Sequence, residues 1–338
     1  MISVGVIGYG YWGPNLVRNF VECPDTRAAM VADRRADRLA EAQRRFPGID
    51  VTTDSAALIE HPGIDAVVVA TPVATHFDLA LAALQAGKHV FVEKPLAHSS
   101  ALAARLVEEA AARNLVLMVD HTFVYTPAVR KIRELMQASE LGDVYYYDSV
   151  RINLGLFQHD VNVLWDLAVH DLSVMDYVLD QQPIAVSATG VSHVVGEPEN
   201  VGYMAMFFEG NLIAHVHANW LAPVKMRRTL IGGSRRMIVF DDLESSEKVK
   251  VYDRGISLNP SPEDVQQMLI GYRAGDMWVP HLPVTEALQN AVRHFAECID
   301  QSLTPTTDGA AGLRLVRLLE AASESIASRG ATVEIVVS

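Results

Sequence analysis

The sequence predicts an α/β protein of two domains: a doubly wound parallel sheet, then an α+β domain built on an open, mostly antiparallel sheet. Its 338 residues exceed what one hydrophobic core usually organises. Residues 2–119 alternate apolar strand-like runs with helical segments, as parallel βαβ units do. After residue 184, strand-like runs follow one another across Gly-containing turns. We therefore expect domains at residues 1–120 and 121–338.

The first strand, residues 2–7, runs directly into Gly8-Tyr9-Gly10-Tyr11-Trp12-Gly13, and a helical segment follows at residues 14–20. Strand, G-x-G-x-x-G turn and helix, in this order, are typical of a Rossmann dinucleotide-binding domain. Gly8 permits the tight turn, Gly10 lets the backbone approach a pyrophosphate, and Gly13 allows close helix–strand packing. The helix N-terminus then attracts the phosphates.

An acidic residue, Asp33, stands at the end of the second strand, residues 28–32, about 20 residues after the glycines. An acid there binds ribose hydroxyls and repels a 2′-phosphate, which favours NAD over NADP. The neighbouring Arg34 could receive that phosphate instead or stack on adenine. A simple glycine turn, with Asp33 as a helix N-cap, is the structural alternative.

The rest of the first domain continues the alternation. Four strands should end at one edge of the sheet, where ligands bind in such folds. This edge would bring Gly8 and Asp33 together with Thr71-Pro72 and Glu93-Lys94. The expected helices are 36–46, 55–60 (capped by Asp54 or Ser55), 76–86 (closed by Gly87) and 100–113 (capped by Ser99 or Ser100), and the expected strands are 51–53, 65–70, 89–92 and 115–119.

The pattern changes near residue 120. We expect helices at 127–137, 161–179, 286–301 and 310–329, a long loop at 258–283, and strands at 144–153, 185–194, 203–208, 212–220, 227–231, 236–240, 249–252 and 332–337. Helices on one face of this sheet would leave the other face open. Its apolar residues then predict either a covered core or a homodimer or homotetramer that pairs through the sheet.

Composition excludes several classes of function. The formal charge is −13, from 28 Lys and Arg against 41 Asp and Glu, which argues against nucleic acid and anionic membranes as main partners. No apolar run is long enough to span a membrane, and the start of the chain lacks the basic region of a signal peptide. The two cysteines have no metal-ligand spacing, so we expect no metal and a cytoplasmic location.

Lys94 is the first candidate for catalysis. It follows a buried strand, between Glu93 and Pro95, at the edge where the nicotinamide should lie. An ammonium group there can hold a substrate oxygen and stabilise a developing alkoxide. An ordinary surface lysine is the alternative.

Asp166 and His170 are the second candidates. They are four residues apart in the expected helix, so both side chains should project from one face. Histidine titrates near neutral pH and can remove a hydroxyl proton, while the carboxylate can orient the ring or bind a hydroxyl. The alternative is that Asp166 and His170 form a hydrogen-bonded pair with a purely structural role, which is the commoner explanation of this spacing.

Four motifs resemble the glucose–fructose oxidoreductase/inositol dehydrogenase (Gfo/Idh/MocA) family over nearly the whole chain. They are the Gly8–Gly13 turn, Val69-Ala-Thr-Pro72 with His76, Glu93-Lys94-Pro95, and Trp165-Asp166-Leu-Ala-Val-His170-Asp171. The resemblance implies NAD(P)-dependent oxidation of a secondary hydroxyl, with Lys94 and His170 as the catalytic pair and Asp166 positioning the substrate. The cofactor contacts it implies are Gly8, Gly10, Tyr11, Trp12, Gly13, Asp33, Arg34, Thr71, Pro72, His76, Glu93 and Lys94.

Asn162-Val-Leu-Trp165 replaces the glycine-rich run that many members have before the aspartate. We expect this change to reshape the pocket, and the chain looks closer to the branch acting on nucleotide-linked sugars, such as 3-dehydrogenases and 3-ketosugar reductases. An inositol or cyclitol 2-dehydrogenase is one alternative, and a non-catalytic NAD-binding regulator or an enzyme acting on a non-sugar is another. The expected substrate contacts are Tyr125, Arg151, Asn153, Gln158, Asn162 and Trp165.

Overall fold

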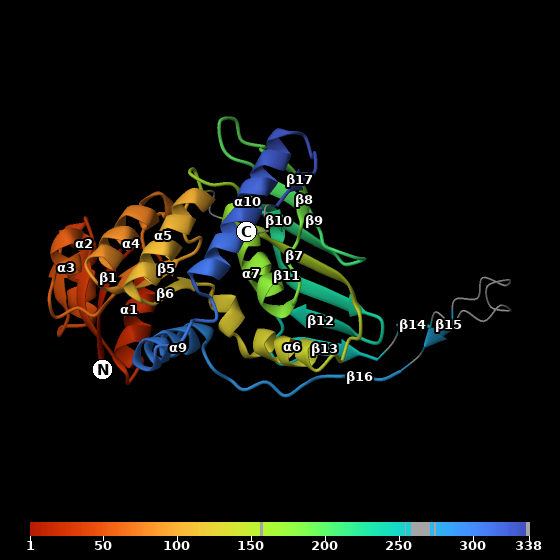
Figure 1. Ribbon diagram of the computed structural model, residues 1–338, viewed down its shortest axis with the longest axis horizontal. Helices are drawn as coiled ribbons and strands as arrows, with labels where there is room; N and C mark the ends of the chain where they lie inside the picture. The colour runs from red at the N-terminus through yellow and green to blue at the C-terminus, as the bar shows by residue number, and fades with distance from the viewer. Residues whose placement is uncertain (156–157, 254, 258–270, 274, 336–338) are drawn as a thin grey trace. The chain divides into compact units, whose positions relative to one another are not determined.

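The computed structural model describes residues 1–155, 158–253, 255–257, 271–273 and 275–335. The chain forms two compact units (Figure 1): residues 1–126 with 285–320, and residues 127–284 with 321–338. This grouping differs from the division expected at residue 120, because residues 285–320 pack with the first unit. Helix α9 (Ala287–Gln301) buries Phe295 there, edge-on against Phe20 and Phe91 with ring centroids 6.3 and 5.4 Å away.

The first unit is built on a six-stranded sheet in which every pairing is parallel. Chain order reverses beside β1, which is the doubly wound Rossmann arrangement that the sequence predicts. Strand β4 is buried at every position, as expected for an apolar strand covered on both faces. Across the sheet the strands are β3 (Asp50–Thr52), β2 (Thr26–Ala32), β1 (Ile2–Ile7), β4 (Ala66–Val69), β5 (His89–Glu93) and β6 (Leu117–Asp120).

Helices flank this sheet, with α4 against α5 and α1 against α9. Side chains cap two of them as expected: Asp54 accepts the Ala56 N–H, and Ser99 accepts the Leu102 N–H. The helical segments of this unit besides α9 are α1 (Gly13–Glu22), α2 (Ala36–Arg45), α3 (Ser55–Ile59), η1 (Val73–Thr75), α4 (His76–Gln85), α5 (Ser100–Arg113) and η2 (Thr122–Tyr125). Helix α10 (Gly309–Ala327) begins in this unit and ends in the other.

The second unit is built on a nine-stranded sheet. Only β7 and β10 pair in parallel among its strands, and the other pairings are antiparallel. In order across the sheet the strands are β16 (Met277–Trp278), β13 (Val249–Tyr252), β12 (Met237–Asp241), β11 (Leu221–Gly233), β7 (Val144–Leu154), β10 (Ile213–Asn219), β9 (Val201–Phe207), β8 (Ala185–Val191) and β17 (Val333–Glu334). The predicted open, mostly antiparallel sheet is therefore confirmed.

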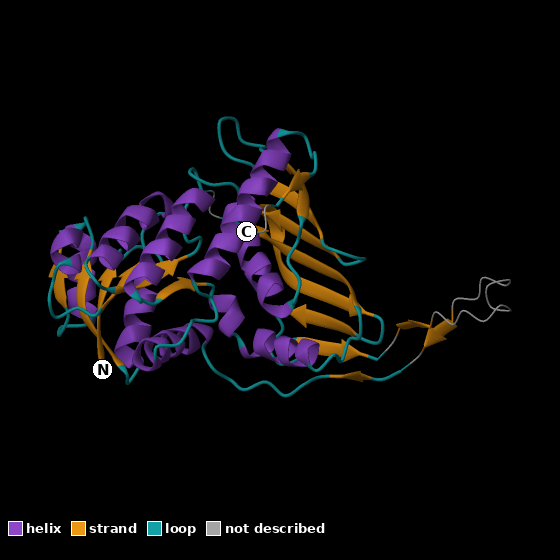
Figure 2. Ribbon diagram, viewed as in Figure 1, coloured by secondary structure: helices purple, strands orange, loops and turns teal. Residues whose placement is uncertain are grey.

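Helices α6 (Pro127–Gln137) and α7 (Val169–Val178) cover one face of this sheet together with the end of α10 (Figure 2). Burial alternates accordingly: Ala214, Val216 and Ala218 of β10 are buried, whereas His215 and His217 are partly exposed. Period-two alternation of this kind marks a sheet with one face on a core.

Two expectations for this unit need correction. The helix expected at residues 161–179 begins with a π-helical turn, η3 (Leu164–Ala168), before α7. The Asn162 side chain accepts the first backbone N–H groups of this turn. The stretch expected as a loop at 258–283 contains β16 and also β15 (Gly271–Arg273), which pairs with β14 (Gly255–Ser257). The π-helical turn and these strands are too short to leave a periodic signal in the sequence. Residues 258–270 and 274 lie outside the described residues, as do residues 336–338, which include the end of the last strand expected at 332–337.

Candidate functional site

The glycine turn after β1 has the geometry that the motif predicts. Gly8 has φ +101°, and a Cβ there would lie 2.3 Å from the Ala70 carbonyl oxygen. A Cβ on Gly13 would lie 2.2 Å from the Gly8 carbonyl oxygen. At Gly10, by contrast, no described atom lies within 4 Å of such a Cβ. Two glycines are therefore required by packing, and the third keeps space open in front of the backbone.

That space belongs to a cleft of about 620 Å³ in the first unit. Six of the predicted cofactor residues line it: Gly8, Gly10, Asp33, Arg34, Thr71 and Pro72. The lining also includes Arg35, Thr53, Asp54, Ser55, Thr75, Asp78 and Leu79, which the sequence reasoning missed. Residues 53–55 could have been found by the same rule as Asp33, since they follow the strand that pairs with β2.

The cleft suits the adenosine and pyrophosphate part of a dinucleotide. Asp33 presents its carboxylate at the end of β2, held by the Tyr9 N–H at 2.7 Å on one oxygen and the Arg35 N–H at 2.9 Å on the other. Carboxylate, open glycine backbone and two arginines are the groups that recognise ribose and phosphate. The described residues therefore fit an NAD(P) cofactor.

His76, a predicted cofactor contact, is not among the residues that line the cleft. It is buried, and its ring nitrogens lie 2.8 Å from two carbonyl oxygens, Nε2 from that of Thr71 and Nδ1 from that of Pro95. The imidazole thus links the loop after β4 to the loop that carries Lys94. His76 therefore supports the two loops through their backbone carbonyls and does not itself line the cleft.

Glu93 and Asp120 pair across the ends of β5 and β6, next to Lys94. Asp120 accepts hydrogen bonds from the Trp12 indole at 3.3 Å and the Thr122 hydroxyl at 2.7 Å. Burial, then the charge of Asp120, raises the pKa of Glu93 well above its usual value, and burial also raises the pKa of Asp120. These two carboxyls therefore retain a proton more readily than exposed ones.

Three other residues of this unit that were predicted to contact the cofactor or the substrate do not line the cleft. Tyr11 is 88% exposed, and Trp12 joins the glycine turn to Asp120. Tyr125, expected at the substrate, is fully buried, with its hydroxyl 3.0 Å from the Thr307 Oγ1. Its aromatic ring serves the core of the first unit.

Asp166 and His170 lie in the second unit, on η3 and at the start of α7. The Trp220 indole donates to Asp166 Oδ2 at 3.1 Å. Sequence reasoning missed Trp220, because it belongs to no motif and lies 54 residues from Asp166. π-Helical turns occur often at functional sites, which agrees with the importance predicted for this segment.

The residues expected around them turn out to hold the segment in place. Asn162 caps it, with Oδ1 accepting the N–H groups of Leu164 and Trp165 at 3.1 and 3.3 Å. The Trp165 indole donates to Ser323 Oγ at 3.0 Å. Arg151 is buried in an ion pair with Asp171, the residue after His170.

Asn153 and Gln158 are the expected substrate contacts that stay partly exposed. Asn153 lies near the end of β7, and Gln158 follows residues 156–157, which lie outside the described part.

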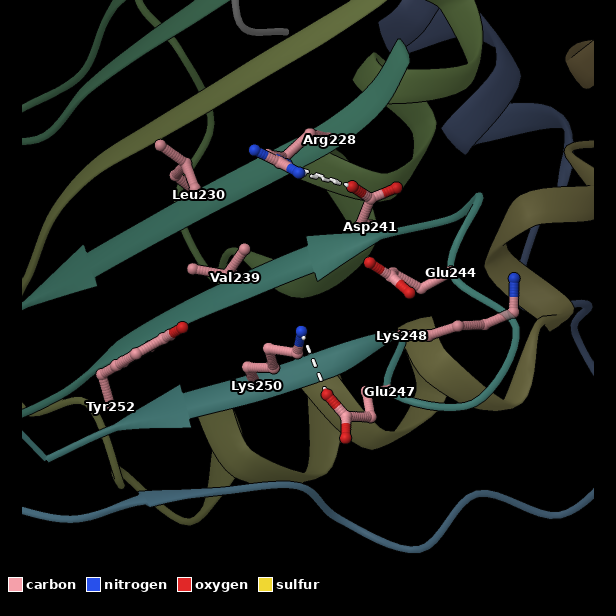
Figure 3. Close-up of a pocket in the computed structure, with 9 residues that line it drawn as sticks. All are labelled: Arg228, Leu230, Val239, Asp241, Glu244, Glu247, Lys248, Lys250 and Tyr252. Carbon is pink, nitrogen blue, oxygen red and sulfur yellow. Dashed lines mark hydrogen bonds and ion pairs between the residues drawn. The ribbon is translucent and has the colours of Figure 1, made fainter. Parts of the chain in front are cut away.

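A further hollow of about 300 Å³ lies on the face of the sheet opposite the helices, over β11–β13 (Figure 3). Leu230, Val239 and Tyr252 contribute to its surface. Its charged residues face one another, with Arg228 Nη2 2.9 Å from Asp241 Oδ2 and Lys250 Nζ 3.1 Å from Glu247 Oε2. Since these cations are already paired with acids, the hollow is a poor match for the phosphates of a nucleotide.

The described residues contain neither a metal-binding cluster nor a membrane-spanning helix. Across the described residues no cluster of His, Cys, Asp and Glu could hold a metal ion. No helix in the same part of the chain is long and apolar enough to cross a membrane.

Family models match both halves of the chain. The model "Oxidoreductase family, NAD-binding Rossmann fold" covers residues 2–121, and the "GFO/IDH/MocA C-terminal domain" covers residues 129–239. The chain belongs to the GFO/IDH/MocA oxidoreductase family. It is an NAD(P)-dependent dehydrogenase acting on CH–OH groups.

Relatives within the family have different substrates in their names. UDP-N-acetylglucosamine 3-dehydrogenase of Acidithiobacillus ferrooxidans is 28% identical to this protein over 93% of this chain and 94% of its own. Its solved structure matches with a TM-score of 0.82 and 26% identity, and the match covers 97% of this chain and 98% of that chain. The scyllo-inositol 2-dehydrogenase (NAD(+)) of Bacillus subtilis is 26% identical over 90% of this chain and 86% of its own. Levoglucosan dehydrogenase, solved with NADH and levoglucosan, has a TM-score of 0.83 at 21% identity, with 99% of each chain covered, and shares the fold.

Proposed function

We propose that this protein oxidises a secondary hydroxyl of a nucleotide-linked hexose to a ketone with NAD, or catalyses the reverse reduction. The observation that carries the proposal is the Asp166–His170 segment. It combines a carboxylate and an imidazole, one helical turn apart, in a chain whose other unit has a dinucleotide cleft. A protein that only bound NAD would have no need of these groups.

In the proposed reaction, His170 removes the hydroxyl proton while the Lys94 ammonium holds the oxygen and stabilises the developing negative charge. Asp166 accepts a hydrogen bond from a neighbouring sugar hydroxyl and so orients the ring. NAD held in the cleft lined by Gly8, Gly10 and Asp33 would supply the acceptor for the hydride that leaves the carbinol carbon. Asn153 and Gln158 contact the substrate, whereas Arg151, Asn162 and Trp165 support the segment that carries the catalytic groups.

NAD is the proposed cofactor. The Asp33 carboxylate lines the cleft, and its negative charge would repel the 2′-phosphate of NADP. Arg34 and Arg35 also line the cleft. We assign them to the pyrophosphate or to adenine stacking, because Asp33 stands directly at the end of β2.

One similarity favours a nucleotide-linked sugar over a free one. The nucleotide-sugar relative UDP-N-acetylglucosamine 3-dehydrogenase aligns over nearly the whole of both chains. A free cyclitol is the second candidate, since the scyllo-inositol 2-dehydrogenase also aligns over most of its length.

A substrate panel tests the proposal. Purified protein is incubated with NAD or NADP and with UDP-N-acetylglucosamine, UDP-glucose, a dTDP-hexose, free glucose, myo-inositol or scyllo-inositol, and reduced nicotinamide is followed by absorbance. We expect the highest kcat/KM with a nucleotide sugar and NAD. A preference for an inositol would transfer the function to a cyclitol dehydrogenase. Tight NAD binding without turnover on any compound would instead favour a regulatory role.

We also propose that the open face of the nine-stranded sheet pairs with a second copy of the chain. Tyr203, Phe207 and Ile213 on this face are each about two-fifths exposed, at 44%, 37% and 45%. Large apolar side chains on one sheet face favour burial against a partner. Light scattering should give a dimer or tetramer that the double variant Phe207→Glu/Ile213→Glu dissociates. Val195→Glu, at an exposed site off the strands, is the control, and a monomeric wild type contradicts the proposal.

A further inference from the structure

Trp220 connects the sheet of the second unit to the predicted substrate-binding carboxylate. It lies between β10 and β11 and is 1% exposed. Its indole nitrogen donates to Asp166 Oδ2 at 3.1 Å. An indole N–H can only donate, so this contact requires Asp166 to present a lone pair at Oδ2.

The Trp220 end of this contact is held rigidly. Its backbone N–H donates to the Asn200 carbonyl at 2.9 Å, and its carbonyl accepts the Gly155 N–H at 3.0 Å. The indole also packs on Gly155, where a Cβ would lie 2.5 Å from Trp220 Cδ1. The backbone of Trp220 is thus tied to two chain segments, and its ring packs against one of them.

The Asp166 end is held by the same region of the chain. The Val163 N–H donates to the Glu199 carbonyl at 2.9 Å, and the Asn162 amide donates to the Glu199 carboxylate at 3.1 Å. Glu199 precedes the Asn200 that holds Trp220. Residues 199–200 therefore fix the position of both the donor and the turn that carries the acceptor.

We infer that Trp220 is the positioning residue that sets the orientation of the Asp166 carboxylate toward the sugar. The inference rests on the proposed function, since it assumes that Asp166 binds a substrate hydroxyl. It adds a residue outside every motif of the chain. The contact fixes one carboxylate oxygen of Asp166, so it restricts rotation of the carboxylate about the Cβ–Cγ bond. A pre-oriented carboxylate binds a hydroxyl without first having to be ordered.

A spectroscopic test addresses the contact directly. In the full-length ¹⁵N-labelled protein, the four tryptophans give four indole N–H signals. Asp166→Asn replaces a charged acceptor by a weaker one, so the Trp220 signal should move while those of Trp12 and Trp278 stay in place. Trp220→Phe assigns the signal. If that variant does not fold, Trp12→Phe, Trp165→Phe and Trp278→Phe assign the other three. An unmoved Trp220 signal overturns the inference.

A kinetic double-mutant cycle then tests the positioning role. Trp220→Phe alone should lower kcat/KM about tenfold or more, mainly by raising KM, as expected for loss of a hydrogen bond to a charged group. In an Asp166→Asn background the same change should cost less than about twofold, because the partner has already been altered. Equal losses in both backgrounds would indicate mere packing and overturn the inference.

The two tests separate failure of this inference from failure of the proposed function. The spectroscopic measurement needs no turnover. If the Trp220 signal responds to Asp166→Asn but no sugar is oxidised, the function fails and the contact stands. If a sugar is oxidised and the losses simply add, the function stands and the positioning role is wrong.

Discussion

Arg151 and Asp171 form a buried ion pair, with Arg151 Nε 2.5 Å from Asp171 Oδ2 and both side chains no more than 5% exposed. The Ser149 hydroxyl donates to the same carboxylate at 2.7 Å. Strand β7 is thereby fastened to the residue that follows His170. Arg151 was expected as a substrate contact, but its partner is a residue of the helix that carries the proposed base.

Removing one partner of this pair should destabilise the protein strongly. We expect Arg151→Met to lower the free energy of unfolding by about 3–5 kcal/mol, because it leaves the Asp171 charge buried without its cation. Lys131→Ala, which removes an exposed ion pair with Glu134 on α6, should cost less than about 1 kcal/mol. Urea denaturation measures both variants. Similar stabilities for the two variants would show that the pair does not anchor the helix.

Gly10 should be required for cofactor binding but not for folding. Gly10→Val fills the open space at the cleft, so NAD affinity should fall by at least about 100-fold with the melting temperature nearly unchanged. Gly48→Val is the matched control, since a Cβ there also meets no described atom within 4 Å and it lies outside the cleft. Calorimetric titration gives the affinities. Unchanged NAD binding in Gly10→Val would place the cofactor elsewhere.

Asp33 should set the preference for NAD. In Asp33→Ser the repulsion of the 2′-phosphate disappears while a ribose partner is partly kept, so the NAD-to-NADP affinity ratio should fall by about tenfold or more. Affinities for both dinucleotides, measured side by side, check this. Loss of affinity for both in equal measure would mean that Asp33 shapes the glycine turn through Tyr9 and does not select the cofactor.

Lys94 and His170 should be needed for chemistry and not for cofactor binding. Lys94→Met and His170→Gln should each lower kcat by about 100-fold or more, the usual scale for general acid–base groups. NAD affinity should stay within about threefold, since neither residue lines the described cleft. Rapid-quench assays with the best substrate of the panel measure kcat. Near wild-type turnover in either variant removes that residue from the mechanism.

The buried pair Glu93 and Asp120 should make stability depend on pH. Burial raises the pKa of Glu93 well above 4.5, so the folded state retains a proton that the unfolded state releases. Stability from this pair is therefore complete below the unfolded value and falls as pH rises toward the raised folded value. Glu93→Gln, which cannot ionise, should gain melting temperature relative to wild type at about pH 8 and little at about pH 4. An equal difference at both pH values would contradict the raised pKa of Glu93.

Much of the fold could be predicted from the sequence because it depends on local signals. The apolar run ending at Val69 is a strand buried on both faces, and the Asp54 and Ser99 caps begin helices where the residue types predict. The π-helical turn at Leu164–Ala168 could not be predicted. Backbone N–H groups at its start are accepted by Asn162 and Glu199, and its Asp166 accepts the Trp220 indole N–H. Glu199 and Trp220 lie far from the turn along the chain.

The sequence by itself determined the dinucleotide-binding turn, the acid at the end of β2 and the family motifs around Lys94 and His170. Each of these is a short pattern whose chemistry depends on spacing along the chain. Only the tertiary structure decided which polar residues face one another. Arg151, Asn162, Trp165 and Tyr125 all looked available for a substrate, yet folding brings each against an internal partner. Pairing across distant segments is a property of the packed sheet and helices, and no local pattern of residues encodes it.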